Sequence, residues 1–595
     1  MIPASHTSPG RGSATRLIAG LAFVYLSFSA VQGKGNDTSL PDAYYPLLEA
    51  GVAKVEDRLA GEPSITLETL EALSEWKHFP YAILAPAVLY VTQHPANHHY
   101  HDPKMLALTT RIGDLLADED EKGRYEPRLD SDWDTYMWLE AYRLLEPQLG
   151  AERRERWKRA ILRNAALVAP AAAERLYFPW YNSPYIITSP NHYAQYASLL
   201  LLAGHVFENK SWESLGSQIL HRFAAEEQTA DGYWGEHSRA GPTTGYDHLT
   251  FTQVALYYEY VHDPVALPAL RLSTDFHEYF TYPDGTPVEV INDRNRYWEV
   301  DTWGHFGFSN FPDGRRYAEF LTTHLHADRL SMSALGRLSQ DALYYHSGLT
   351  APIPQDQTRY VHAMSVPAGI RKTGPWVVCF SGIVSTQAPL NQFYLDRQSS
   401  VSIFHEKLGL VVTGANSKRQ AELASFQEEA GGQSFQLPLS GRLEMGKDED
   451  QLSLAYNTFF SNLHVPLPSP ERVLLHYVLT RTARQEKAQL NLQLCLKPGE
   501  ELETAQGLVT LGTQPLSVGW DLPGGWVRHH GWKLSVDKAA TLTWPIYPYN
   551  PYSAAPEESL DHAVGVLSVP FKLTRQNEAD SGLDKIEISV VLEAE

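Results

Sequence analysis

Cysteine is scarce in this sequence, which has 595 residues and two cysteines, Cys379 and Cys495. Neither has a neighbouring cysteine or a CxxC spacing, and this argues against a thiolate zinc cluster. Both lie in strand-like runs of the C-terminal half. They are expected either to pair in an oxidising compartment or to remain buried thiols.

Positive charge is also in short supply. Lys and Arg together number 49 against 70 Asp and Glu, which gives a formal net charge of −21. This balance argues against a nucleic acid partner. An anionic substrate stays compatible with it, because a local basic cleft can lie within an acidic surface.

Long apolar runs are missing except near the N-terminus, where Arg11 and Arg16 precede the run 17–30 and small residues follow up to Gly33. This pattern predicts a signal peptide over residues 1–33. The alternative is an uncut N-terminal anchor, although the run is short for a membrane span. We therefore expect an exported protein, periplasmic or secreted, with no membrane association after cleavage.

Aromatic residues, in contrast, are abundant: 14 Trp, 32 Tyr and 21 Phe. Such numbers suit sugar-stacking surfaces, although most of these rings are expected in hydrophobic cores. The hydrophobic content of 43% and the charged content of 20% are ordinary for a globular protein. The length exceeds what one core accommodates, so two or more domains are expected.

Residues 40–350 show helical periodicity, with apolar residues spaced by three and four and breaks that carry Gly, Pro, Asn and Asp. Two helices open near Pro41 and Ser64. The others are expected at about 80–93, 104–118, 132–146, 151–168, 191–207, 211–226, 246–261 and 315–340. Paired helices with long, aromatic-rich connections predict an (α/α) toroid of helical hairpins, with the connections lining a groove on one face.

Residues 357–595 show strand patterns instead, after a Pro-rich boundary at about 350–354. Runs rich in β-branched and aromatic residues predict a large antiparallel β-sandwich. The expected strands cover about 360–366, 376–384, 400–404, 409–413, 473–480, 490–496 and 585–592. The predicted fold class is therefore multidomain α+β, a toroid followed by a sandwich.

The first candidate site is the stretch Ser189-Pro190-Asn191-His192-Tyr193. Ser189 suits an N-cap and Pro190 the first helical position. Asn191 and His192 are then expected in the first turn of a helix. An amide and an imidazole at a helix N-terminus can neutralise a carboxylate and move a proton.

Two further clusters contain basic groups. Residues 231–248 form a Gly-rich stretch that includes His237, Arg239 and Tyr246, the last at the start of a predicted helix. Residues 292–299 contain Arg294 and Arg296.

Asn, His, Arg and Tyr among aromatic walls suit β-elimination at a uronic acid residue. The C5 proton becomes removable when the neighbouring carboxylate is neutralised by hydrogen-bond donors or a cation. A base then takes this proton, and an acid protonates the departing O4. His and Tyr suit these two tasks, with Tyr activated by a nearby cation. This scheme requires no metal.

In these residues, Asn191-His192-Tyr193 followed by Arg239 and Tyr246, the sequence resembles the α/α-toroid polysaccharide lyases, alginate and glucuronan lyases above all. The helical half followed by a sandwich resembles the heparinase II/III-like, chondroitin AC and hyaluronate lyases. The resemblance implies that Asn191 and Arg239 clamp the carboxylate and that His192 neutralises it or acts as base. Tyr246 would be the acid, and also the base when the departing groups are syn.

Eight residues are candidates for substrate binding: Tyr193, Trp180, Tyr185, Trp234, His237, Arg294, Arg296 and Trp138. Structural roles remain open for several residues, since Tyr246 can be a core tyrosine and Arg294 and Arg296 can form salt bridges. His405 and His476 are candidates for a structural metal site in the sandwich. No other cofactor is expected, and the expected partner is an anionic polysaccharide.

Three other functions remain open. A glycoside hydrolase needs two carboxylates about 5–10 Å apart, and the candidates are Asp132, Asp134, Asp231, Glu236 and Asp247. A uronate epimerase shares proton abstraction at C5, and an exported polysaccharide-binding protein needs only the aromatic platforms. The polymer, endo or exo cutting, syn or anti elimination and the oligomeric state are not determined by these patterns.

Overall fold

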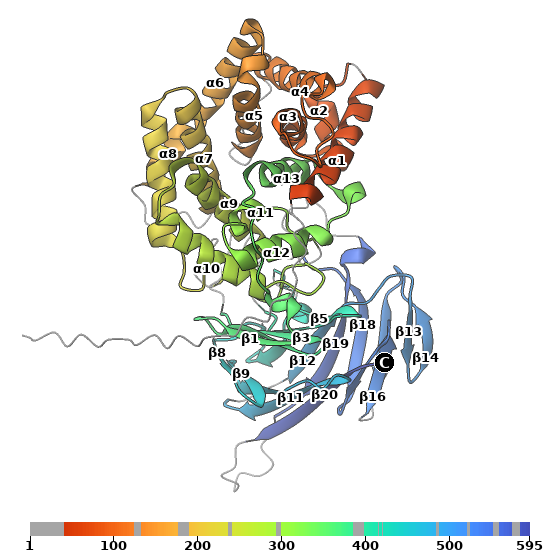
Figure 1. Ribbon diagram of the computed structural model, residues 1–595. Helices are drawn as coiled ribbons and strands as arrows, with labels where there is room; N and C mark the ends of the chain where they lie inside the picture. Colours follow the sequence, from red (N-terminus) through yellow and green to blue (C-terminus); the bar gives the residue numbers. More distant parts are fainter. Residues whose placement is uncertain are drawn as a thin grey trace, which may run out of the picture. The chain divides into compact units, whose positions relative to one another are not determined.

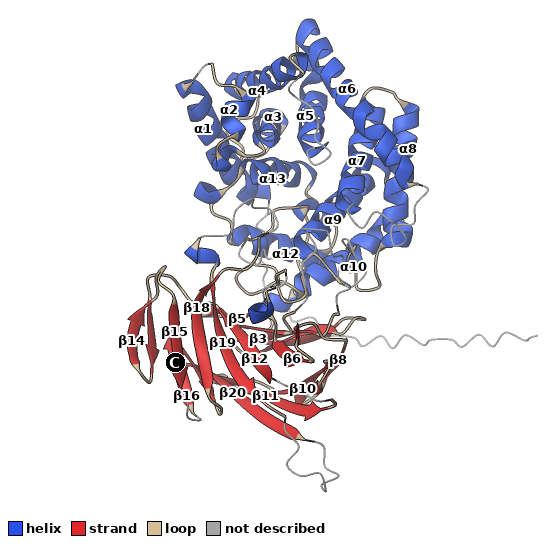
Figure 2. Ribbon diagram, turned by 180° about the vertical axis from the view of Figure 1, so that it is seen from behind, coloured by secondary structure: helices blue, strands red, loops and turns tan. Residues whose placement is uncertain are grey.

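The computed structural model describes residues 41–62, 64–123, 132–176, 190–235, 241–292, 299–384, 398–414, 416–418, 420–483, 487–520, 524–550, 559–573 and 584–595. Helices make up the N-terminal part of this region and strands the C-terminal part (Figure 2). The expected signal peptide lies outside the described residues. None of the described helices combines the length and the apolar character that crossing a membrane requires.

The helical part contains α-helices and short 3₁₀ or π turns, labelled in chain order. Their bounds are α1 Pro41–Gly61, α2 Leu67–Glu71, η1 Ser74–Trp76, η2 Phe79–Ile83, α3 Leu84–Val91, α4 Pro103–Glu121, α5 Asp132–Leu145, η3 Glu146–Gln148, α6 Ala151–Arg175, α7 Pro190–Val206, α8 Lys210–Arg222, η5 Phe223–Glu227, α9 Thr244–Val261, α10 Ala266–Tyr279, α11 His305–Phe308, α12 Pro312–Thr323, η6 Ala327–Arg329, α13 Met332–Tyr344 and η7 Pro354–Asp356.

Six of these helices form a closed ring. Along the chain α3, α5, α7, α9, α11 and α13 each contact the next, and α13 contacts α3. The helix that follows each of the first five packs against it, and α1 packs against α13 (Figure 1). The first α-helix, α1, is thus the outer partner of the last α-helix, α13. This arrangement is the predicted toroid of helical hairpins.

The burial of the helices agrees with their places in the ring. α7 is buried on nearly every side, as its apolar run Leu199–Ala203 requires. Its partner α8 is amphipathic and carries the exposed ion pair Lys210–Glu213. The two helices approach closely at Gly216, where an added Cβ would lie 2.4 Å from the Ala197 carbonyl oxygen. Glycine is therefore required at this crossing.

The strands form two antiparallel sheets. Their bounds are β1 Arg359–Ala363, β2 Ala368–Thr373, β3 Trp376–Ser381, β4 Val401–His405, β5 Gly409–Thr413, β6 Phe426–Ala430, β7 Gln433–Phe435, β8 Ser440–Met445, β9 Glu449–Ala455, β10 Phe459–Pro466, β11 Arg472–Arg481, β12 Lys487–Leu494, β13 Glu501–Thr504, β14 Gly507–Thr510, β15 Leu516–Trp520, β16 Gly525–His529, β17 Trp532–Val536, β18 Ala540–Ile546, β19 Val564–Phe571 and β20 Lys585–Ala594; short helical turns η8 Ala421–Leu423 and η9 Leu560–His562 lie between them.

One sheet has the order β1-β2-β3-β4-β5-β12-β19-β18-β15, with β6 and β7 joined to it at β12. The other has the order β14-β13-β16-β17-β20-β11-β10-β9-β8. Residues of both sheets share one hydrophobic core, which makes them a sandwich. In β11, every second residue from Val473 to Leu479 is buried, as a half-exposed strand requires.

β3 is buried on both faces, and the reason is the helical part. Trp376, Val378 and Phe380 belong to the core between the sheets. Val377 and Cys379 belong to a different cluster, which includes aromatic residues of α10 and of the segment after it. Helical residues therefore cover the outer face of this sheet at β3.

Some expectations need correction. The helical pattern over 315–340 is two helices, α12 and α13, separated by residues 324–331. α10 and α11 were not expected. Cys379 is buried on β3, Cys495 follows β12, and the two form no disulfide.

Candidate active site

The first turns of three inner helices lie close together. Trp133, in the first turn of α5, has its ring centroid 5.7 Å from that of Trp303, and α11 begins two residues after Trp303, at His305. A Cβ added to Gly245, in the first turn of α9, would lie 4.0 Å from Asp301 Oδ2. Each helix N-terminus presents unpaired backbone N–H groups and a partial positive charge. Several such termini around one opening, which we call the N-terminal mouth, favour an anionic ligand.

α7 carries three candidate residues in its first turn. The helix begins at Pro190 as predicted, so Asn191 and His192 lie in its first turn. The Asn191 side chain is buried, with 1% of the residue exposed. His192 and Tyr193 are partly exposed. An amide fixed inside the first turn thus lies beside an imidazole and a phenol that solvent reaches.

Tyr246 lies in the first turn of α9, the inner helix that contacts α7. It is partly exposed, whereas the next two residues, Asp247 and His248, are buried. Tyr246 is therefore no core tyrosine. Asn191, His192 and Tyr246 thus each lie in the first turn of an inner helix, and the two helices contact each other.

Asp247 anchors the segment that precedes α9. Its Oδ1 accepts a hydrogen bond from the Trp234 backbone N at 2.6 Å. Its Oδ2 accepts from His277 Nε2 at 2.8 Å and from Ser273 Oγ at 3.3 Å. Burial raises the pKa of Asp247 to about 7 and lowers the pKa of His277 to about 3. The imidazole therefore donates this hydrogen bond in its uncharged form.

Asn292 anchors a second segment at the same place. Its Nδ2 donates to Thr244 Oγ1 at 3.0 Å, and Thr244 is the first residue of α9. Its carbonyl oxygen accepts from Asn416 Nδ2 at 2.6 Å. Asp301, which follows residues 293–298, also lies near α9. A Cβ added to Gly245 would lie 4.0 Å from Asp301 Oδ2. Residues 292 and 301, on either side of Arg294 and Arg296, thus both lie by the first turn of α9.

The prediction that Trp234 and Trp138 are stacking platforms for a sugar is wrong. Trp234 is 1% exposed, and its Nε1 donates to the Phe223 carbonyl oxygen at 2.9 Å. Trp138 is fully buried and packs edge-on against Trp157, with 5.9 Å between the ring centroids. Both rings belong to the hydrophobic core of the helical part, so neither offers a face to a sugar.

Six of the sequence candidates lie outside the described residues, and their roles stay predictions. They are Trp180, Tyr185, His237, Arg239, Arg294 and Arg296.

Sequence reasoning missed a group built around Trp303. The Trp303 ring centroid lies 5.7 Å from that of Trp133 in the first turn of α5. The Arg337 guanidinium of α13 lies 4.6 Å from the Trp303 centroid, close enough for a cation–π interaction. Asp301 Oδ1 accepts from the Trp303 backbone N at 2.8 Å. Arg337 places a cation near the N-terminal mouth. The helical sequence pattern around Arg337 did not predict this position.

The ring is filled toward its other end. Glu140 on α5 accepts hydrogen bonds from Tyr260 on α9 at 3.0 Å and from Gln340 on α13 at 3.1 Å. Tyr344 on α13 also donates to Glu140 and hydrogen bonds to Tyr260 at 2.7 Å. α5, α9 and α13 are alternate members of the ring, so side chains that join them meet across its interior. The side chains of this network thus occupy the interior of the ring near the C-termini of α5, α9 and α13.

The two histidines considered for a metal in the sandwich do not come together. His405 is on β4 and His476 on β11, in different sheets. His405 packs edge-on against Trp376 at 4.5 Å, and its Nδ1 accepts from the Lys407 backbone N. His476 hydrogen bonds to Ser589 on β20. The predicted pair forms no common site.

No family model and no curated protein sequence matches this chain. Solved structures resemble it at low identity. A chondroitin AC lyase of Streptomyces coelicolor A3 is 12% identical, with 93% of this chain and 79% of that chain covered and a TM-score of 0.46. A heparinase III is 11% identical, covers 93% and 77%, and has a TM-score of 0.46. A mutant heparan sulfate lyase of Pedobacter heparinus is 11% identical, covers 87% and 76%, and has a TM-score of 0.45. At these values the likeness carries no functional conclusion, which must come from the residues.

Proposed function

We propose that this protein is a polysaccharide lyase that cleaves a uronic-acid-containing polysaccharide by β-elimination, with alginate or glucuronan as the first candidates. The observation that carries the proposal is the contact between two inner helices that begin with candidate residues. Asn191 and His192 lie in the first turn of α7 and Tyr246 lies in the first turn of α9, and α7 and α9 contact each other.

The carboxylate of the sugar is bound first. Arg239 supplies a cation, and the helix N-termini add their partial positive charge. Asn191 is 1% exposed, so its amide can donate to the carboxylate only when the side chain turns toward the substrate. Negative charge that develops on the carboxylate during proton abstraction is thereby stabilised. Support for Arg239 near this place is indirect: Trp234, which precedes it, is anchored to Asp247 beside Tyr246.

Proton transfer follows. His192 or Tyr246 takes the C5 proton, the C4–O4 bond breaks, and the electron pair of the C5–H bond forms the C4–C5 double bond. Tyr246 gives its proton to the departing O4. The partial exposure of His192 and Tyr246 is what both roles require, because each side chain must reach the substrate.

The hydrolase alternative loses two of its candidate carboxylates. Asp247 is fully buried and already accepts three hydrogen bonds. Asp231 accepts two from the backbone N and the hydroxyl of Ser365. Neither is available to act on a glycosidic bond, whereas no described contact opposes elimination.

A matched pair of variants tests the acid. Tyr246→Phe should lower kcat by about 10²–10⁴-fold, as expected for loss of a general acid or base, with little change in binding. Tyr258→Phe, on the same helix near its other end, should retain wild-type turnover. A Tyr246→Phe enzyme with full activity would refute this assignment.

A second pair tests α7. His192→Ala should lose turnover, and His205→Ala, exposed in the last turn of the same helix, should not.

A pure binding protein would show no turnover in any form and unchanged polysaccharide affinity in Tyr246→Phe. An epimerase would exchange the C5 proton with D₂O without forming a double bond. Export to the periplasm or medium is part of the proposal, and cell fractionation tests it.

A further inference from the structure

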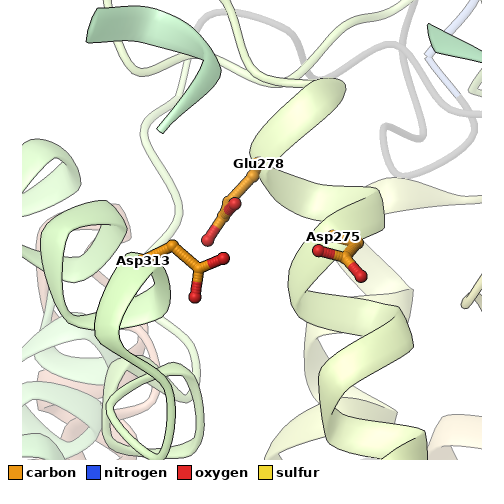
Figure 3. A group of neighbouring side chains, drawn as sticks. All are labelled: Asp275, Glu278 and Asp313. Carbon is orange, nitrogen blue, oxygen red and sulfur yellow. The ribbon is translucent and has the colours of Figure 1, made fainter. Parts of the chain in front are cut away.

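Three carboxylates that take no part in the proposed elimination converge between α10 and α12. Asp275 and Glu278 lie near the C-terminal end of α10, and Asp313 lies in the first turn of α12. One oxygen atom from each lies within 4.8 Å of the others. Figure 3 shows the carboxylates of Glu278 and Asp313 facing each other across the gap between the two helices.

Glu278 is the member that a purely structural role does not explain. Only 3% of the residue is exposed, and its Oε1 has no hydrogen-bond partner among the described residues. A buried carboxylate oxygen without a partner costs free energy unless a proton or a cation compensates it. Burial, and then the charge of Asp313, raises the pKa of Glu278 to about 9.

The charge balance of the cluster favours a divalent ion. Arg271 donates to Asp313 at 2.6 Å and also pairs with Asp275. One guanidinium against three carboxylates leaves two negative charges when Glu278 is ionised. The buried Glu278 lies on the side of the cluster that faces the protein interior. The side chains of Asp275 and Asp313 are 45% and 28% exposed. An ion can therefore enter from solvent on the aspartate side.

We propose that Asp275, Glu278 and Asp313 form a binding site for a divalent cation, with Ca²⁺ as the preferred ion. Carboxylate oxygens are ligands for hard cations. Ca²⁺ binds oxygen at about 2.3–2.6 Å, so it can bridge oxygens up to about 4.6–5.2 Å apart. Mg²⁺, at about 2.0–2.1 Å, spans only about 4.0–4.2 Å. Separations of up to 4.8 Å are within the reach of Ca²⁺ without movement of the helices, whereas Mg²⁺ requires every separation to be below about 4.2 Å.

The place of the cluster indicates a structural role for the ion. The Glu278 carbonyl oxygen accepts from Gln355 Nε2 at 2.6 Å, and the Gln355 carbonyl oxygen accepts from Lys372 Nζ on β2 at 3.2 Å. A cation would thus join α10 to α12 where the helical part meets the sheet. Its binding should raise thermal stability more than it changes turnover.

Calorimetric titration of the chelator-treated full chain with CaCl₂ tests the site. We expect one Ca²⁺ per chain, a higher Tm with Ca²⁺, and weaker binding of Mg²⁺. Glu278→Gln should lose both the binding and the Tm shift. Glu319→Gln, elsewhere on α12, should keep both.

The folding control is the Tm of Glu278→Gln without Ca²⁺, which should equal or exceed that of the wild type because a neutral amide is easier to bury. A wild-type chain that binds none of Ca²⁺, Mg²⁺ and Mn²⁺ at millimolar concentration would overturn the proposal. So would Ca²⁺ binding that persists unchanged in both Glu278→Gln and Asp313→Asn.

The pH dependence gives an independent readout, because the ion must displace the Glu278 proton. Ca²⁺ affinity should rise about tenfold per pH unit up to about pH 9. Other charged or titratable groups interact with this carboxyl from α10 and α12: Arg271, Asp275, Tyr279, Asp313 and Tyr317. An affinity that does not change between pH 6 and pH 8 would contradict displacement of this proton.

Discussion

Replacing Asp247 by alanine should strongly destabilise the helical part. The carboxylate is fully buried and is the acceptor for the Trp234 backbone N–H, the His277 imidazole and the Ser273 hydroxyl. The Ser273 bond is long, at 3.3 Å, and a helical serine can donate to its own backbone instead. The Trp234 and His277 donors have no such alternative.

The magnitude follows from these two donors. Each buried donor left without an acceptor costs about 1–3 kcal/mol, so Asp247→Ala should lose about 2–6 kcal/mol of unfolding free energy. For a domain of this size that corresponds to a fall in Tm of roughly 4–12 °C. Asp247→Asn keeps an oxygen for Trp234 but none for His277 and should lose about 1–3 kcal/mol, whereas Ser273→Ala should lose about 1 kcal/mol.

Thermal unfolding of the three variants, monitored by far-UV circular dichroism, measures the effect. The expected order of stability is wild type, then Ser273→Ala, then Asp247→Asn, with Asp247→Ala lowest. Catalytic activity should fall in the same order, because Asp247 anchors the segment before Tyr246. An Asp247→Ala protein within 1 kcal/mol of the wild type would refute the view that this carboxylate organises the mouth.

Three further predictions concern packing and pH. Gly113→Ala should lose about 1–3 kcal/mol in thermal unfolding, since the new Cβ would lie 2.0 Å from Trp157, whereas Gly150→Ala meets nothing within 4 Å and should be near neutral. Without added cation, the stability of the wild type should fall by up to about 1.4 kcal/mol per pH unit between pH 6 and pH 8. The reason is that folded Glu278 keeps its proton up to about pH 9 while the unfolded form releases it near 4.5; Glu278→Gln should remove this slope. Between about pH 4 and pH 6.5 the Asp247–His277 pair should leave stability in thermal unfolding nearly unchanged, because the proton that folded Asp247 keeps up to about pH 7 offsets the proton that folded His277 takes up only near pH 3; Asp247→Asn should expose the acid sensitivity of His277.

Local signals were enough to predict much of the fold. Pro190 at a first helical position, followed by an apolar run, identified α7 to within a residue. The strands of the sandwich followed from alternation and β-branched residues. α10 was missed because Pro264 and Pro268 read as breaks, although Pro268 falls in the first turn, where its missing N–H costs nothing. The break between α12 and α13 contains no Gly or Pro; its one local signal is the N-cap Ser331.

The site was predicted in part, for a physical reason. A residue's place at a helix start is local information, and Asn191, His192 and Tyr246 have this property. Whether a tryptophan faces a groove or a core depends on distant partners, and Trp138 and Trp234 proved to be core residues. Contacts between separate helices also depend on residues that are distant in the sequence. For this reason the Glu140 network and the Asp275–Glu278–Asp313 cluster were not predicted.

The measurement that tests the central proposal most directly is ultraviolet absorbance of the purified protein mixed with uronic-acid polymers: alginate, glucuronan, chondroitin sulfate and heparan sulfate, with neutral glycans as controls. Elimination leaves a C4–C5 double bond conjugated to the carboxylate, so absorbance should grow on at least one uronate polymer and not on the neutral ones. Tyr246→Phe should abolish that growth. New reducing ends without any absorbance change would instead show hydrolysis and contradict the proposal.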